Sequence, residues 1–475
     1  MWLLALVLVG LVWAQPARPT PAGKGASESA NGSQAEQKIS AKEAEALFHD
    51  VDEILKFAST DSALPVKHEV KRRLATRDQV VAYLEKTMAE DKDAQRLRRS
   101  ELMLKKFGLL PRGFDLQKFL LALLREQVAG YYDPKTQTVN LLDWIGAEQQ
   151  RPVLAHELTH ALQDQSFGLE KWIRPDDTVL AEKHDPVSAD IENDEVSEAR
   201  QAVVEGQAMV VLVDYMLAPT GQSLLASPQI ANALKEGMLV GTAESPEFQN
   251  APIFLKEELT FPYRYGLDFE AELLRTGGKQ KAFAAAFASP PRSTREIMEP
   301  STYLSGERLE PLPLPDFSED FKNYQRFDIG AMGEFDVAIL VDQYAGVQAS
   351  HEIYPHWRGG YYYAVLPKGD PSAPLGVLYF SRWSSPEKAG AFAAIYARAL
   401  EKRYQHVHEV AEPGISPVRP LQDLATLRGA HTWLTEEGPV FIEVRADKAL
   451  ITESLDQPTT QRLEQELLGT ASAVR

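Results

Sequence analysis

His156-Glu157-Leu158-Thr159-His160 lies inside a run of residues with helical periodicity and is the most informative stretch of this chain. Residues four apart share one face of an α-helix, so both imidazoles can point toward a single metal ion. Glu157 follows the first histidine, and its carboxylate can reach a water on that metal. Two histidines and an adjacent carboxylate at this spacing are the residue types that zinc-dependent hydrolysis of an amide needs.

The residues around this motif, 152–167, are expected to form one amphipathic helix. Apolar side chains recur at helical spacing and form a stripe made of Val153, Leu154, Leu158, Ala161 and Leu162. Pro152 suits the first turn of such a helix, and Gly168 suits its C-terminal end. The alternative is an ordinary surface helix that happens to carry two histidines, and the helical context and a plausible third ligand argue against it.

The whole chain has the composition of a globular protein. Its 475 residues are too many for one small core, so we expect two domains. A formal net charge of −18 argues against nucleic acid or an anionic membrane surface as the main partner. No cysteine occurs, which excludes thiolate ligands and leaves His, Asp and Glu to hold a metal. The chain also lacks Gly-x-Ser-x-Gly and P-loop motifs, so serine-hydrolase and nucleotide chemistry have no support.

The N-terminus is typical of a secreted protein. Residues 1–14 form an apolar run that is too short to span a bilayer and fits a signal peptide, with cleavage after Ala14. Residues 15–40 are rich in Pro, Ala, Gly and Ser, and we expect a disordered linker there. The protein is therefore expected to be secreted or to reside in the periplasm or cell envelope, with no stable membrane span after signal removal. An uncleaved N-terminal anchor is the alternative.

A β-hairpin is predicted ahead of the histidine helix. Helical segments precede it at 44–59, 77–90, 94–107 and 115–124. Residues 128–132 and 138–142 are strand-like, with a turn at 133–136. An edge strand beside a metal site can pair with a peptide substrate through main-chain hydrogen bonds, and the residues expected to do so are Val128, Ala129, Gly130 and Tyr131. Plain scaffolding explains the hairpin equally well.

The second half of the chain changes character after a proline-rich stretch at 289–318, which is the best candidate for a domain boundary. Before it we expect a long helix at 190–217 and a loop-rich stretch around 261–266. After it, strands are predicted at 361–366, 376–380, 430–435 and 440–445, and helices at 335–343, 387–404 and 459–468. The expected fold is therefore α+β, with a mostly helical domain and a small β-hairpin or sheet at 41–318, followed by a smaller α+β domain at 319–475.

A catalytic zinc ion usually has three protein ligands and a water, so a third ligand must be found. Glu205 lies in an otherwise apolar helical run, where a carboxylate is costly unless it is paired or bound to metal. Gly206 beside it permits close approach of two helices. Glu198, on nearly the same helical face, is the alternative ligand, and a salt bridge from Glu205 to Arg200 or a lysine is the alternative role.

These residues resemble a known family. The sequence His-Glu-Leu-Thr-His-Ala at 156–161 is similar to the active-site helix of the thermolysin family, and Glu-Gly-Gln-Ala at 205–208 looks like the glutamate helix of zinc aminopeptidases. Both belong to the gluzincins, whose third zinc ligand is a glutamate. Longer strings between residues 66 and 310 resemble secreted bacterial proteins predicted to be metallopeptidases. The resemblance implies a zincin-like fold for 41–318.

Two features depart from the family pattern. Glu205 follows His160 by 45 residues, a longer spacing than in thermolysin, and Met209 stands where that pattern has an aspartate. A different group must therefore orient His156. Asp164, one turn past His160, is expected to serve the second histidine.

The expected activity is zinc-dependent hydrolysis of a peptide or protein substrate. Zn²⁺ would be held by His156, His160 and Glu205, and Glu157 would act as the general base. A donor must also stabilise the oxyanion, and we expect Tyr263 or Tyr265, with Arg264 and His184 as further candidates. The alternative is a non-catalytic or weakly catalytic binding protein of the cell envelope that retains the fold and acts through its C-terminal domain.

Overall fold

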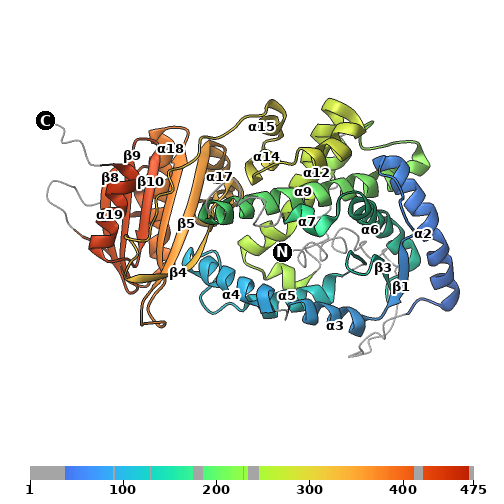
Figure 1. Cartoon of the computed structure of the whole chain (residues 1–475), viewed down its shortest axis with the longest axis horizontal. Helices are drawn as coiled ribbons and strands as arrows, with labels where there is room; N and C mark the ends of the chain where they lie inside the picture. Colours follow the sequence, from blue (N-terminus) through green and yellow to red (C-terminus); the bar gives the residue numbers. More distant parts are fainter. Residues whose placement is uncertain are drawn as a thin grey trace, which may run out of the picture.

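The computed structural model shows an α+β protein in which helices occupy one end of an elongated molecule and a large antiparallel sheet occupies the other (Figure 1). It describes residues 38–88, 91–128, 130–174, 186–227, 229–233, 245–410 and 421–469. The predicted signal peptide and residues 15–37 of the predicted linker lie outside the described residues, so secretion stays a prediction.

Helices dominate the first part of the chain. In order they are α2 (Ala41–Ser62), α3 (Arg77–Met88), α4 (Asp91–Lys106), α5 (Leu116–Gln127), α6 (Ala147–Phe167), α7 (Leu169–Ile173), α9 (Pro186–Leu217), η1 (Ala218–Thr220), α11 (Pro246–Gln249), α12 (Ile253–Lys279), η2 (Gln280–Ala285), α13 (Ala286–Ala288), α14 (Thr294–Met298) and α15 (Pro300–Ser305). All four helices predicted before the hairpin are present. Capping sets their ends: Ser40 and Glu43 form a capping box at α2, and Asp115 accepts a hydrogen bond from the Lys118 N–H at α5.

The predicted hairpin is confirmed and belongs to a three-stranded sheet. β2 (Tyr131–Asp133) pairs antiparallel with β3 (Thr138–Leu142), and β1 (Lys71–Ala75) pairs with β3 in parallel, giving the order β1-β3-β2. β1 was not predicted, because its sequence Lys-Arg-Arg-Leu-Ala is mostly charged and carries no apolar alternation. β2 is the edge strand that lies toward α6.

Helix α6 is longer and more deeply buried than the sequence suggests. It begins at Ala147, so Pro152 lies inside the helix and not in its first turn. Gly168 ends the helix as predicted, with a φ of 69° and its N–H donating to the Asp164 carbonyl. All residues of 153–163 are buried, so the expected amphipathic pattern is wrong at the centre of the helix. Polar side chains there lie in the core, where each needs a partner.

Two long helices, α9 and α12, pack against each other beside α6. Their backbones meet at Gly206 and Gly266, because a Cβ added to Gly206 would lie 2.3 Å from the Gly266 carbonyl oxygen. Helix α12 includes residues 261–266, so the loop expected there is wrong. Pro262 removes one hydrogen bond from this helix, but burial of Phe261 and Tyr263 against neighbouring elements holds the helical backbone.

One described helical segment, Ile191–Thr220, is long and apolar enough to cross a membrane. Its most apolar window is 72% buried inside the protein, which is the pattern of a core helix.

The second part of the chain forms a seven-stranded antiparallel sheet with the order β4-β5-β6-β10-β9-β8-β7. Its strands are β4 (Tyr324–Ala331), β5 (Trp357–Pro367), β6 (Gly376–Trp383), β7 (Val407–Glu409), β8 (Gly429–Thr435), β9 (Gly438–Arg445) and β10 (Lys448–Glu453). Helices α16 (Glu334–Ala345), α17 (Val347–Ile353), α18 (Pro386–Arg403) and α19 (Gln457–Leu468) and the short turns η3 (Tyr354–His356) and η4 (Leu421–Asp423) complete it. The four predicted strands and three predicted helices are present, and β4, β7 and β10 were missed.

The two parts share buried surface. One apolar cluster runs from Leu47 on α2 through α6, α9 and α12 to Phe392 on α18 and Trp433 on β8. Lys106 on α4 forms ion pairs with Glu437 at 2.8 Å and with Glu453 of β10 at 3.6 Å. The other face of the sheet carries a separate cluster covered by α19. The proline-rich stretch therefore separates two structural parts that remain packed together.

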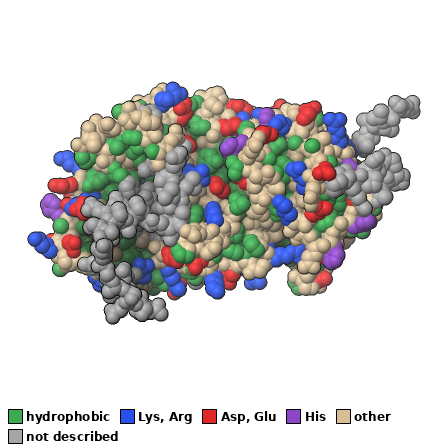
Figure 2. All heavy atoms as spheres, turned by 180° about the vertical axis from the view of Figure 1, so that it is seen from behind, with side chains coloured by type: hydrophobic (Ala, Val, Ile, Leu, Met, Phe, Trp, Pro, Cys, Tyr) green, Lys and Arg blue, Asp and Glu red, His purple; other side chains and the backbone are tan. Residues whose placement is uncertain are grey.

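Charged and apolar side chains are mixed on the face of the molecule that Figure 2 shows. On the face in Figure 2, acidic and basic side chains alternate with apolar ones across both parts of the molecule.

Candidate metal centre

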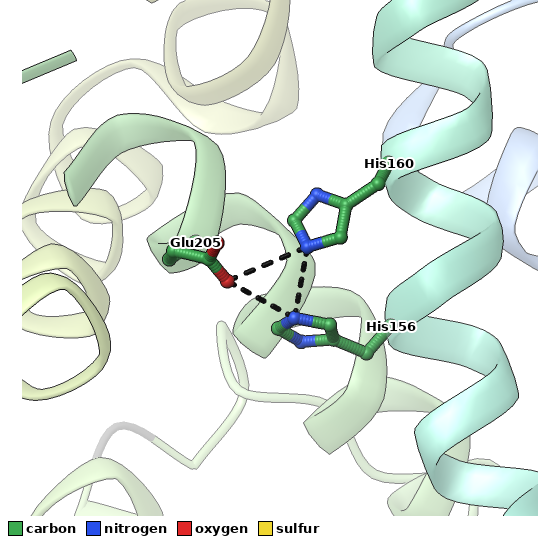
Figure 3. Close-up of side chains that lie close together, drawn as sticks. All are labelled: His156, His160 and Glu205. Carbon is green, nitrogen blue, oxygen red and sulfur yellow. Dashed lines mark hydrogen bonds and ion pairs between the residues drawn. The ribbon is translucent and has the colours of Figure 1, made fainter. Parts of the chain in front are cut away.

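Three side chains converge between α6 and α9. His156 and His160 lie one turn apart on α6, and Glu205 faces them from α9 (Figure 3). The Nε2 atoms of the two histidines are 2.9 Å apart, and the Glu205 Oε2 atom lies 3.1 Å from the first and 3.4 Å from the second. All three residues are at most 8% exposed. The structure thus brings together the three residues that the sequence analysis named as ligands.

This arrangement could hold a metal ion. A tetrahedral ion with bonds of about 2 Å keeps its ligand atoms roughly 3.3 Å apart, which matches the three separations. Nitrogen and carboxylate oxygen are ligands that suit zinc and other divalent transition metals. Buried polar atoms normally have complementary partners, yet here three potential lone-pair donors face one another. A shared cation resolves that conflict.

Without a metal, a proton must reduce the repulsion between the lone pairs of the three ligand atoms. The pKa of His160 is raised to about 9: burial alone would lower it, but the charge and hydrogen bonding of Glu205 outweigh burial. Burial also disfavours the Glu205 anion, yet the two histidines lower the pKa of Glu205 to about 2. Burial and the charge on His160 lower the pKa of His156 to about 4. At neutral pH the metal-free site therefore holds an ionised Glu205, a protonated His160 and a neutral His156.

Glu157 lies beside this group and is 1% exposed. Its Oε2 atom accepts a hydrogen bond of 2.7 Å from the backbone N–H of Tyr132 on edge strand β2. Burial raises the pKa of Glu157 to about 7, although the charge on His160 opposes the rise. The role of Tyr132 was missed, because a backbone contact between residues 25 positions apart leaves no signature in side-chain type.

The partner of His160 also differs from the prediction. Its Nδ1 atom lies 2.9 Å from Oε1 of Gln163, one residue before the expected Asp164. Asp164 instead accepts hydrogen bonds from the Tyr132 hydroxyl at 2.9 Å and from the Leu169 N–H at 3.0 Å. Gln163 and Asp164 both lie one turn from His160, so helical spacing alone does not separate them. The hydrogen bond from the Tyr132 hydroxyl holds the Asp164 side chain toward the hairpin, and Gln163 is the residue that meets His160.

His156 is oriented differently from His160. Its Nδ1 atom has no hydrogen-bond partner among the described residues, and the Met209 side chain, also buried, offers no strong acceptor. The ring of Tyr263 stacks on His156, with centroids 6.2 Å apart and an interplanar angle of 22°. Stacking on Tyr263 and the contact of its Nε2 atom with Glu205 at 3.1 Å therefore orient this imidazole, while its Nδ1 atom has no partner among the described residues.

The residues expected to donate a hydrogen bond to the oxyanion lie in different surroundings. Tyr263 is 2% exposed and lies beside His156, whereas Tyr265 packs against Phe261 and Phe335. Residues two apart on a helix point to different sides, so both tyrosines cannot face the metal centre. Arg264 pairs with Glu257 at 3.1 Å. His184 lies outside the described residues.

Glu198, the alternative ligand, lies in a different environment. Seven residues span two helical turns, about 10 Å along the axis, so sharing a face with Glu205 does not bring it to the same ion. It belongs to an acidic group of electrostatically interacting carboxyl side chains, made of Asp194, Glu195 and Glu198 on α9, Glu258 on α12 and Asp336 on α16. Burial and the neighbouring Glu258 raise the pKa of Glu198 well above its ordinary value.

The residues proposed to pair with a substrate directly precede Tyr132, whose N–H binds Glu157, but they are enclosed. Val128 and Tyr131 are 5% and 2% exposed, and a Cβ at Gly130 would lie 3.3 Å from the Val153 side chain. Ala129 lies outside the described residues. The outward edge of β2 faces Glu157 through the Tyr132 N–H. Pairing with a substrate stays a prediction.

Comparison with protein-family models, with characterised proteins and with solved structures found no match to this chain.

Proposed function

We propose that the chain is a zinc-dependent peptidase. The observation that carries the proposal is the convergence of the His156, His160 and Glu205 ligand atoms within 3.4 Å, with the carboxylate of Glu157 beside them. Three protein ligands from two helices leave a fourth position for water or substrate, which is the pattern of catalytic zinc. The resemblance of 156–161 and 205–208 to gluzincins supports the same assignment.

Zinc bound by these three residues would supply Lewis-acid chemistry, lowering the pKa of a water and polarising a carbonyl. The protein supplies the proton transfers. Glu157 takes the proton of the attacking water and delivers it to the amine nitrogen that leaves. Because Oε2 of Glu157 is held by the Tyr132 N–H, Oε1 is the atom that carries the proton. A peptide or protein is the proposed substrate.

Tyr263 is the proposed donor to the oxyanion. It is the candidate tyrosine that lies beside His156, and its ring is fixed by stacking on that imidazole. Tyr265 is not part of this proposal, because its aromatic contacts lie with Phe261 and Phe335.

The direct test combines metal content with a variant of Glu157. Purified protein is expected to contain one zinc per chain, to cleave members of a peptide library, and to lose activity with a chelator. Glu157→Gln should lower kcat by about 10²–10⁴ while retaining zinc, because Glu157 is not a ligand. Unchanged cleavage by Glu157→Gln, or a protein that takes up no zinc, would overturn the proposal.

A second candidate is a binding protein in which the metal only stabilises the fold. The burial of all four central residues favours it, since a substrate needs access to the ion. The same experiment separates the two candidates: stoichiometric zinc without cleavage of any library member, together with unfolding on metal removal, would support the structural role.

A further inference from the structure

A chain of buried amides leads away from His160. Oε1 of Gln163 lies 2.9 Å from His160 Nδ1, and Nε2 of Gln163 donates to Oε1 of Gln207 at 3.0 Å. Nε2 of Gln207 then donates to the carbonyls of Ala282 at 2.7 Å and Phe283 at 3.2 Å. Both glutamines are completely buried. This series of hydrogen bonds crosses from α6 to α9 and ends on η2.

The direction of every hydrogen bond in this chain is fixed by backbone groups. A carbonyl oxygen only accepts, so the Gln207 atom facing Ala282 and Phe283 must be its NH₂ group. Its Oε1 therefore accepts from Gln163, whose NH₂ group also donates to the Val204 carbonyl at 3.1 Å. The Gln163 oxygen is left for His160, and Nδ1 of His160 must carry a hydrogen.

The last hydrogen bonds in this series of amides are made to the backbone of η2. η2 is a π-helical turn, and it follows Gly278, whose φ of 65° breaks helix α12. Such turns are rare and often occur at functional sites. The carbonyls of Ala282 and Phe283 belong to this turn and accept the hydrogen bonds of Gln207 Nε2.

We propose that Gln163 and Gln207 are positioning residues that set the tautomer and ring orientation of His160. With Nδ1 bearing the hydrogen, the lone pair of neutral His160 lies on Nε2, the atom that faces His156 and Glu205. This inference rests on the proposed metal site, but its first test needs no metal. His156 has no such support, since its Nδ1 atom lacks a partner among the described residues.

The metal-free protein provides that first test. In protein labelled with ¹⁵N-histidine and held at a pH where the His160 ring is neutral, the hydrogen-bonded Nδ1–H of His160 should give a downfield proton signal that exchanges slowly with water, and Nε2 should give the shift of a nitrogen without hydrogen. Gln163→Met removes the acceptor and should abolish the signal. Gln207→Met leaves the Val204 contact in place and should speed the exchange without abolishing the signal. A wild-type protein without this signal, or a Gln163→Met protein that keeps it, would overturn the inference.

Zinc affinity provides the second test, with Gln150→Met as the matched control. Gln150 is also a buried glutamine of α6, but it binds the Leu142 and Ile145 backbone at the hairpin. Gln163→Met should weaken zinc binding by about 10- to 100-fold, and Gln150→Met should not. Equal affinities in the two variants would overturn a positioning role. A wild type that binds no zinc but shows the Nδ1–H signal would instead count against the proposed function alone.

Discussion

At the scale of single residues, the proton on His160 is expected to control how the candidate metal site binds an ion. Glu205 raises the pKa of His160 to about 9, while the pKa values of His156 and Glu205 are about 4 and 2. Between about pH 5 and pH 8, His160 is therefore the one ligand that is protonated in the metal-free site. A metal must displace that proton, because only the neutral imidazole binds it.

We therefore predict that the affinity for zinc rises about tenfold per pH unit as the pH increases from about 6 to 8. The rise should level off near pH 9, where His160 is neutral without metal. Calorimetric titration at pH 7.5 in buffers of different ionisation enthalpy should show about one proton released per zinc bound. An affinity that is flat over this window would mean that the site holds no displaceable proton.

Residue chemistry was the most predictable part of the site. His156, His160 and Glu205 could be named because a metal centre needs particular side chains, and a buried carboxylate in an apolar helix is conspicuous. Gln163 and the Tyr132 N–H could not, since both act through hydrogen bonds whose partners depend on how hairpin, α6 and α9 pack. A neutral amide and a backbone N–H carry no compositional signal.

At the scale of elements, the contact between α9 and α12 sets the position of Glu205. Gly206 follows the ligand directly, and its Cα hydrogens face the backbone of Gly266. Any side chain at either position separates the helices. The loop expected at 261–266 was wrong for a related reason: proline and glycine normally interrupt helices, and only packing against α9 shows why this helix needs a glycine.

Gly206→Ala should therefore reduce zinc affinity and stability together. The added Cβ would lie 2.3 Å from the Gly266 carbonyl oxygen, and such overpacking costs about 1–3 kcal/mol. Denaturant unfolding and a chelator competition assay measure the two effects. Gly113→Ala is the control, because a Cβ at Gly113 meets nothing within 4 Å. If Gly206→Ala binds zinc as tightly as the wild type, then Glu205 can still reach the ion after its helix moves.

At the scale of the whole molecule, the acidic group lies where the helical part meets the sheet. Thr294 donates to Glu195, and Arg96 lies 3.4 Å from Asp194. Burial raises the pKa of Asp194 to about 7, that of Glu195 to about 8 and that of Glu258 to about 7. Repulsion from Asp336 adds to each of these pKa shifts. Folding thus favours the protonated form of several carboxyl groups at this junction.

Raised carboxyl pKa values make stability fall as pH rises. The folded protein binds more protons than the unfolded chain from about pH 4.5 to pH 8, so the free energy of unfolding should decrease across that window. Metal-free protein should melt several degrees lower at pH 8 than at pH 6. Glu258→Gln should flatten this dependence, because the amide that replaces the carboxyl group has no charge to bury.

Glu257→Gln is the matched control for that measurement. Glu257 precedes Glu258 on α12 but pairs with Arg264 at 3.1 Å. Loss of this ion pair should lower the free energy of unfolding slightly at every pH and leave its dependence on pH unchanged. If the wild-type protein is equally stable at pH 6 and pH 8, then water or bound ions offset the cost of ionising the acidic group in the folded protein.

The shared core between the two parts has a consequence for limited proteolysis. Residues 306–316 form no helix or strand and are mostly exposed, so we expect a protease to cut within this stretch of the described residues. The fragments should not separate, because apolar side chains from α2 to β8 stay interlocked and the Lys106–Glu453 pair lies across the junction. A denaturing gel would then show two bands, while size-exclusion chromatography would show a single particle of unchanged mass.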